Sequence, residues 1–119
     1  PTRKEVDVYG SCLGHSVEPE KMRLIATALK SQGFKMQKWF MPVGPGDGPA
    51  GLQRNVDMVR LLREAVGTDA DLMFDAFMGW DYNYAIQWAN ISTAALRRCG
   101  ICRRARSAWC RPIRSGAAA

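Results

Sequence analysis

The segment Asp71-Leu72-Met73-Phe74-Asp75 is a short apolar run that ends in a carboxylate and is followed by a helical pattern. An earlier run, Gly33-Phe34-Lys35-Met36-Gln37-Lys38, has the same organisation and ends in a lysine. In folds that alternate strands and helices, the carboxyl ends of parallel strands meet at one rim, where catalytic groups gather. Lys38 and Asp75 therefore have the positions of one half of a metal-and-base site, and the other half is not in this chain.

The rest of the chain repeats this pattern of strand, loop and helix. We predict strands near residues 5–10, 34–40 and 71–75 and helices near residues 19–32, 50–66 and 81–91. Three successive units of this kind imply parallel strands with right-handed crossovers. The fold class is therefore α/β, and both a doubly wound sheet and a (β/α)8 barrel fit the pattern.

Local signals mark where the elements begin and end. Pro19 suits the first turn of a helix, Gly33 and Gly67 suit helix ends, and Asp81 is a good N-cap for the third helix. Residues 42–49 contain three prolines and three glycines, so we expect a loop without regular structure there. This loop is not a phosphate-binding loop, because the Lys-Ser/Thr ending of that motif is missing.

Length and composition fit one globular domain. The chain has 119 residues, of which 47% are hydrophobic and 24% charged. It contains neither an apolar run of the roughly 18–20 residues that a membrane helix needs nor the apolar core of a signal peptide. We therefore expect a cytoplasmic protein without a membrane partner. The start at Pro1, without an initiator Met, suggests a mid-gene start and hence a fragment.

The net charge of +6 comes entirely from the C-terminal segment. Residues 1–90 carry 10 basic and 11 acidic side chains, whereas residues 91–119 carry seven arginines and no acid. The arginines are Arg97, Arg98, Arg103, Arg104, Arg106, Arg111 and Arg114. The near-neutral body gives no reason to expect a nucleic-acid partner.

We therefore divide the chain into an α/β domain at residues 1–90 and a basic tail at residues 91–119. The tail has no apolar period after Leu96 and reads as a frame-shifted or misjoined sequence, or else as a disordered basic arm. Cys99 and Cys102 have the spacing of metal ligands, but the tail has only three cysteines and no histidine, which argues against a structural zinc site.

Each candidate site residue also has an ordinary structural interpretation. A carboxylate at the end of a buried strand, such as Asp75, is costly unless it is paired or binds a metal, but it could also cap a loop or helix. Lys38 could be a solvated strand residue. His15, the only histidine, lies in the first loop of the predicted rim and could contact a ligand, although an ordinary loop histidine is the commoner case.

Three motifs together resemble the enolase superfamily. They are Gly33-Phe34-(x)3-Lys38, Gly44-Pro45-Gly46-Asp47-Gly48-(x)2-Gly51-Leu52-(x)2-Asn55, and the run from Leu72 to Ala85 that contains Leu-Met-Phe-Asp. Within that superfamily they are most similar to the mandelate-racemase-type acid-sugar dehydratases, particularly the rhamnonate dehydratase branch. The resemblance extends from about Val6 to Trp88.

The resemblance implies three βα units of a (β/α)7β TIM-type barrel, incomplete here, that binds one Mg²⁺ through three carboxylates. Asp75 matches the first of these carboxylates. The implied activity is that of a hydro-lyase, in which a base removes the proton α to the carboxylate of a sugar acid and water is then lost. Full-length relatives of this kind are expected to be homo-oligomers.

Two departures from the family pattern matter. Many relatives carry Lys-x-Lys on the second strand, whereas this chain has Lys38-Trp39-Phe40 and therefore lacks the second lysine, which acts as a base. The resemblance then implies that Lys38 orients or neutralises the substrate carboxylate. The other two metal carboxylates, the histidine base and the capping domain are also missing, so we expect this chain to be inactive alone.

Two functional hypotheses follow. The first is a piece of a Mg²⁺-dependent sugar-acid dehydratase. The second is a small non-catalytic α/β domain whose basic tail binds nucleic acid or another polyanion, with an affinity that falls as salt rises.

Overall fold

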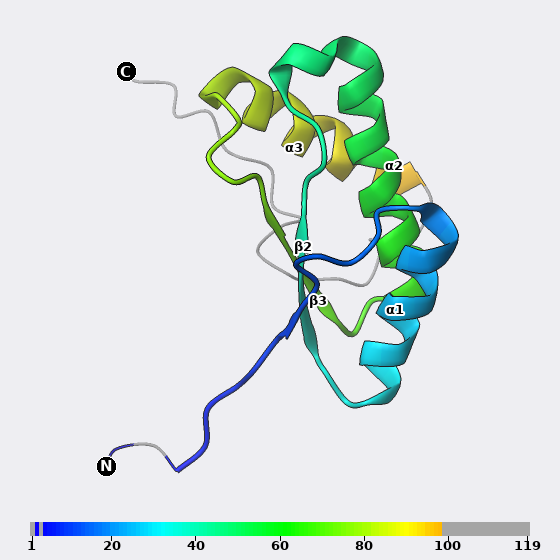
Figure 1. Ribbon diagram of the computed structural model, residues 1–119, viewed down its shortest axis with the longest axis vertical. Helices are drawn as coiled ribbons and strands as arrows, with labels where there is room; N and C mark the ends of the chain where they lie inside the picture. Colours follow the sequence, from blue (N-terminus) through cyan, green and yellow to red (C-terminus); the bar gives the residue numbers. More distant parts are fainter. Residues whose placement is uncertain (1, 3, 99–119) are drawn as a thin grey trace.

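A computed structural model describes residue 2 and residues 4–98 of the chain (Figure 1). Its elements are β1 (Gly10–Ser11), α1 (Pro19–Ser31), β2 (Met36–Phe40), the 3₁₀ helix η1 (Pro45–Asp47), α2 (Gly48–Val66), β3 (Asp71–Asp75) and α3 (Tyr82–Arg98). The described part is therefore a mixed α/β structure in which strands and helices alternate, as the sequence predicts.

The three strands form one parallel sheet in the order β1-β2-β3. In the register of β2 and β3, Lys38 lies opposite Met73 and Phe40 lies opposite Asp75. This confirms the predicted parallel pairing and the positions of the second and third strands. Both strands end at the same edge of the sheet, from which the loops to α2 and α3 leave (Figure 1).

The prediction of a first strand over residues 5–10 is wrong, because only Gly10 and Ser11 pair with β2. Gly10 lies opposite Gln37, and β2 begins one residue earlier, at Met36. Within the described part of the chain, residues 4–8 therefore have no strand to pair with, and Val6 and Val8 are exposed. This segment projects away from the sheet in Figure 1.

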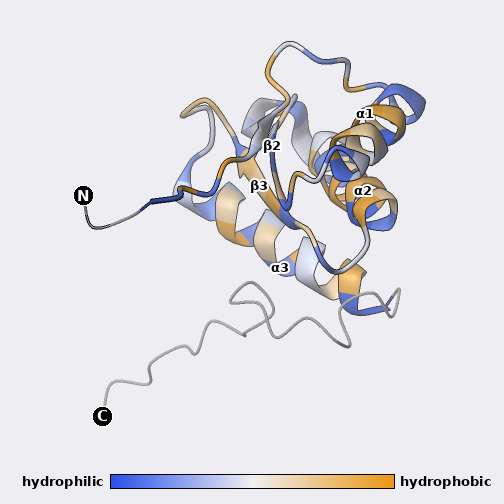
Figure 2. Cartoon of the chain, turned by 90° about the horizontal axis from the view of Figure 1, so that it is seen from below, coloured by the Kyte–Doolittle hydropathy of each residue, from blue (hydrophilic) through white to orange (hydrophobic). Residues whose placement is uncertain are grey.

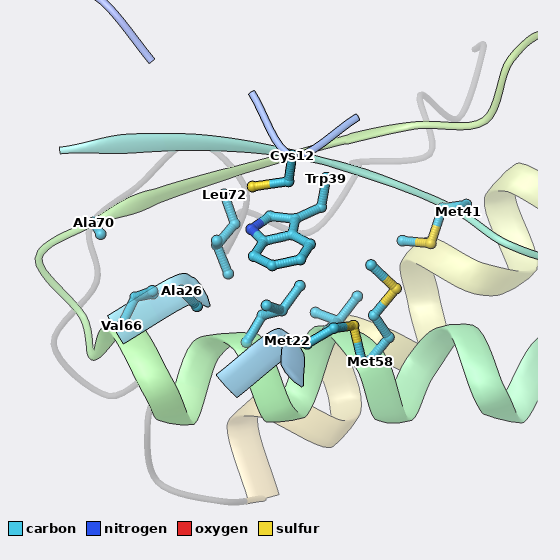
Figure 3. Close-up of a cluster of buried hydrophobic side chains, with 11 residues drawn as sticks. Cys12, Met22, Ala26, Trp39, Met41, Met58, Val66, Ala70 and Leu72 are labelled. Atoms are coloured by element: carbon cyan, nitrogen blue, oxygen red, sulfur yellow. The ribbon is translucent and has the colours of Figure 1, made fainter. Parts of the chain in front are cut away.

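The helices cover one face of the sheet. Trp39 and Leu72 point from β2 and β3 into a core that α1 and α2 complete, and Figure 3 shows these side chains between the strands and the helices. From the third helix, Trp88 packs edge-on against Phe74 of β3. In Figure 2 apolar and polar stretches alternate along the helices, as expected when one side of each helix is buried.

The core residues come from β2 and β3, from α1 and α2 and from the segments next to the strands. The buried cluster contains Cys12, Met22, Ala26, Trp39, Met41, Met58, Val59, Leu62, Val66, Ala70 and Leu72. None of the helices in the described ranges is long and apolar enough to cross a membrane.

One buried polar residue joins the sheet to the helix layer. The side chain of Gln37 is fully buried, and its Nε2 donates a hydrogen bond to the carbonyl oxygen of Ala26 in α1 at 2.9 Å. Its Oε1 accepts a hydrogen bond from Nε1 of Trp39 at 3.1 Å. Both ends of the amide are therefore bonded, which allows a polar residue to occupy the buried face.

The helix boundaries agree with most of the local signals. Gly33 and Gly67 follow α1 and α2 with positive φ angles of 91° and 74°. Asp81 caps α3, because its Oδ1 accepts a hydrogen bond from the N–H of Tyr84 at 2.8 Å.

Two expectations about regular structure need correction. Residues 42–49 are not wholly irregular, since η1 and the first two residues of α2 lie there. Pro49 lies in the first turn of α2, where a proline costs no hydrogen bond. The third helix extends past residue 91 to Arg98, with Ala95 buried. Residues 99–119 lie outside the described residues, so the separate tail stays a prediction.

We predict that Gln37→Leu lowers the free energy of unfolding by about 1–3 kcal/mol, because it leaves the buried indole N–H of Trp39 without an acceptor. Urea unfolding followed by tryptophan fluorescence measures this change. Gln87→Leu on the exposed side of α3 is the control, and it should stay within about 0.5 kcal/mol of the parent chain. Equal stability of the two variants would contradict this role of Gln37.

Candidate functional site

The sheet face opposite the helices carries the two residues that the sequence singled out. Successive residues of a strand point to opposite faces, so Lys38 and Asp75 lie on the other side of the sheet from Trp39 and Leu72. No helix of the described part covers this helix-free face, and the six residues that β2 and β3 place on it are exposed or half-buried. They are Met36, Lys38, Phe40, Asp71, Met73 and Asp75.

Lys38 and Asp75 form an ion pair at the carboxyl ends of the two strands. Nζ of Lys38 lies 2.8 Å from Oδ2 of Asp75, and the two side chains are 30% and 34% exposed. The register explains the contact, because Asp75 lies opposite Phe40 and is thus diagonal to Lys38 on the same face. The structure therefore brings together the two residues that the sequence predicted to lie on one rim.

The hydrogen bond between these groups changes both of their pKa values. The bond from Lys38 and then the bond from the backbone N–H of Phe77 lower the pKa of Asp75, while partial burial opposes them. The bond to Asp75 raises the pKa of Lys38. At neutral pH the carboxylate is therefore ionised and the amine is protonated.

A tight turn after β3 holds the second oxygen of the carboxylate. The N–H of Phe77 donates to Oδ1 of Asp75 at 2.9 Å, and the N–H of Gly79 donates to the carbonyl of Ala76 at 2.8 Å. The ring of Phe77 stacks on Phe40 at a centroid distance of 4.9 Å. Lys38 Nζ lies 5.3 Å from the centroid of the Phe40 ring. The pair thus has an aromatic wall beside it.

Asp75 is a candidate ligand for a hard metal ion at this rim. A carboxylate such as Asp75 suits Mg²⁺, which prefers oxygen ligands and retains water where protein ligands are few. Within residues 4–98, however, no three His, Cys, Asp or Glu side chains come together. Asp75 fits one position of a magnesium site, and the remaining ligands would have to come from elsewhere.

Neither the side chain of His15 nor that of Cys12 bonds to the two side chains of this pair. His15 is exposed in the loop after β1, and its contact with a ligand stays a prediction. Cys12 at the end of β1 is buried, and burial raises the pKa of its thiol to about 11, so it is not a reactive thiolate at neutral pH. Cys99 and Cys102 lie outside the described residues.

Sequence reasoning missed the residues that surround the pair. The two rings of the aromatic wall, Phe40 and Phe77, come from different strand ends, and the bond from Phe77 to Asp75 depends on an unusual backbone conformation. The only sequence signal was Gly79, which is typical of the end of a tight turn. Two more residues bond to Val43 in the loop after β2: Trp80 from the loop after β3 and Asn55 from α2.

Comparison with known proteins identifies the family. Residues 21–96, which include β2, α2 and β3 and all but the ends of α1 and α3, match the family described as enolase C-terminal domain-like. The match covers more than half of the chain, and the chain therefore belongs to this family. This confirms the resemblance on which the sequence analysis relied.

A curated relative gives a narrower likeness. Over 61 residues the chain is 41% identical to L-rhamnonate dehydratase from Saccharopolyspora erythraea. The matched segment is 51% of this chain but only 16% of that protein. The chain is thus an enolase superfamily fragment related to L-rhamnonate dehydratase.

We predict that the coupling between Lys38 and Asp75 depends on pH. Because the folded pKa of Asp75 is lowered, its contribution to stability is complete above its unfolded pKa of about 4 and is lost as pH falls through the folded value. The folded pKa of Lys38 is raised. The contribution of Lys38 to stability is therefore complete below its unfolded pKa of about 10 and is lost as pH rises through the folded value.

A double-mutant cycle of Lys38→Met and Asp75→Asn, followed by urea unfolding, measures the coupling energy at each pH. The ion pair between Lys21 and Glu18 is the control, since these side chains are 60% and 66% exposed and should couple weakly at every pH. A coupling between Lys38 and Asp75 that is equal at pH 7 and in strong acid would contradict the prediction.

Proposed function

We propose that this chain is part of a Mg²⁺-dependent sugar-acid dehydratase, a hydro-lyase that removes the proton α to a carboxylate and then eliminates water. The observation that carries the proposal is the ion pair of Lys38 and Asp75 at the carboxyl ends of two parallel strands, in a chain of the enolase C-terminal domain-like family. The likeness to L-rhamnonate dehydratase supports a sugar acid as the class of substrate.

The arrangement of the helices supports a barrel. The strand order follows the chain order, and the helices pack on one face of the sheet. A doubly wound sheet has helices on both faces, whereas a (β/α) barrel keeps all helices outside and turns the other face inward. The helix-free face with Lys38 and Asp75 would then be the interior of a TIM-type barrel, of which this chain contains three βα units.

The charge state of Lys38 supports a role in binding rather than in proton removal. An ammonium group that is hydrogen-bonded to Asp75 and has a raised pKa cannot accept a proton at neutral pH. It can bind the carboxylate of a substrate and neutralise the negative charge that develops when the α proton leaves. In this proposal the base is a histidine from a part of the barrel that the chain does not contain.

Asp75 would hold Mg²⁺ together with two further carboxylates. Members of the enolase superfamily generally use this ion, which supplies positive charge beside the substrate carboxylate. Since no three potential metal ligands come together among the described residues, we expect weak Mg²⁺ binding at most and no dehydration by the 119-residue chain alone. The complete enzyme would be a cytoplasmic homo-oligomer.

The family match does not support the other hypothesis, a non-catalytic α/β domain with a polyanion-binding tail. Most of the basic segment that this hypothesis needs lies outside the described residues. No described feature of the body favours it over the dehydratase.

A chimera tests the role of Lys38. In an intact dehydratase of this branch, residues 6–88 of this chain replace the equivalent segment, and activity should be retained. We predict that Lys38→Met lowers kcat/KM for the sugar acid at least about 10-fold, since it removes a charged hydrogen-bond donor from the substrate carboxylate. Steady-state kinetics measures the loss.

The matched control is Lys35→Met, which removes an exposed lysine just before β2 and should leave kcat/KM unchanged. Full activity of the Lys38→Met chimera would remove Lys38 from the proposed site. An inactive parent chimera would contradict the assignment of this chain to a dehydratase.

A further inference from the structure

Four residues connect the loops that follow β2 and β3, and we call them the loop clamp: Val43, Asn55, Trp80 and Tyr84. The carbonyl oxygen of Val43 accepts two hydrogen bonds, from Nε1 of Trp80 at 2.9 Å and from Nδ2 of Asn55 at 3.0 Å. Nδ2 of Asn55, whose side chain is fully buried, also donates to the hydroxyl of Tyr84 at 3.1 Å. The clamp thus joins the two loops, α2 and α3.

Close packing reinforces these bonds. The ring of Trp80 packs edge-on against Tyr84 at 4.9 Å and lies 5.1 Å from the ring of Trp88. A Cβ atom at Gly44 would lie only 3.3 Å from the carbonyl oxygen of Gly79 and 3.6 Å from the Trp80 indole. The two loops therefore meet closely at Gly44, where a side chain would push the Gly79 carbonyl away by a few tenths of an ångström.

The segment between Asp75 and Trp80 has a strained backbone. Phe77 and Met78 have positive φ angles of 51° and 59°, in a region that residues with a side chain rarely adopt. Apolar burial does not explain this conformation, because Phe77 is 60% and Met78 fully exposed. Strain of this kind persists only where the surrounding structure enforces it.

Two contacts can enforce it: the stacking of Phe77 on Phe40 holds the middle of the turn, and the clamp holds its end at Trp80. The turn is bounded by Asp75, which is fixed in the sheet, and by Trp80, which is fixed by Val43. Between these two anchors the turn aims the N–H of Phe77 at Oδ1 of Asp75. A shift of Trp80 would release the turn, and the carboxylate would lose one of its two bonds, the one to Oδ1, while the bond from Lys38 to Oδ2 would remain.

We propose that Trp80 is a positioning residue for Asp75: its bond to Val43 keeps the strained turn of Phe77 and Met78 closed onto the carboxylate. Trp80 acts through the turn and does not touch the carboxylate. Asp75 would be held in this way whether or not it binds a metal ion.

The test uses two substitutions of the same type in one aromatic cluster. Trp80→Phe removes the indole N–H that bonds to Val43, whereas Trp88→Phe removes a buried indole N–H that has no partner. Amide hydrogen exchange of Phe77, measured by NMR on the 119-residue chain, reports on the bond to Asp75. Exchange of the Trp39 amide in the core reports on global unfolding.

We expect Trp80→Phe to speed exchange of the Phe77 amide by about 5-fold, the equivalent of one lost hydrogen bond, relative to any change at Trp39. Trp88→Phe should leave the Phe77 rate within about 2-fold of the parent chain, since it breaks no bond to the loops. An unchanged Phe77 rate in a folded Trp80→Phe variant, or equal acceleration by both variants, would overturn the proposal.

A second pair of variants serves if Trp80→Phe does not fold. Gly44→Ala pushes the loops apart by a few tenths of an ångström without removing a donor, and it should also speed Phe77 exchange. Gly46→Ala is its control, because nothing lies within 4 Å of a Cβ at that position. Equal exchange rates of the Phe77 amide in these two variants would contradict the role of the clamp. That outcome would leave the dehydratase assignment unaffected, because the experiment does not measure turnover.

Discussion

The parallel register of β2 and β3 is the constraint on which the rest of the structure depends. Opposite residues share a face of the sheet, so pairing Phe40 with Asp75 places the carboxylate diagonally beside Lys38. A shift of one residue would turn Asp75 toward the helices, where an ionised carboxylate without a partner is costly. One register therefore determines both the core and the candidate site.

The two faces of the sheet differ in what they contact. Trp39 and Leu72 build the core with the helices, and Gln37 is accepted there because both ends of its amide are bonded. The helix-free face carries a charged pair that stays about one-third exposed. This asymmetry is what a barrel wall requires, with one side packed on helices and the other turned toward a ligand.

The sequence allowed the second and third strands and the meeting of Lys38 with Asp75 to be predicted, because both depend on local patterns and on parallel pairing. The first strand was predicted too long, since the pattern at Val6 and Val8 cannot show that β2 has no residues left to pair with them. The helical start of α2 was missed because the prolines and glycines of residues 42–49 were interpreted only as helix breakers.

Local sequence patterns could not predict the residues that surround the Lys38–Asp75 ion pair. Asn55 and Tyr84 are 29 residues apart, and Val43 and Trp80 are 37 apart, so their contacts exist only after the sheet has formed. The positive φ angles of Phe77 and Met78 could not be predicted either, because neither residue type favours that conformation. Local patterns thus reveal the two main residues of the site, and long-range contacts fix the positions of the residues around them.

The central claim is that Asp75 is a ligand of a divalent cation in the complete barrel. Electron paramagnetic resonance of Mn²⁺, a stand-in for Mg²⁺ with similar oxygen ligands, tests it directly in the intact dehydratase that carries residues 6–88. Asp75→Asn should weaken Mn²⁺ binding at least about 10-fold, while Asp71→Asn, at the other end of β3, should not. Equal Mn²⁺ affinity of the parent chimera and its Asp75→Asn variant would contradict the account.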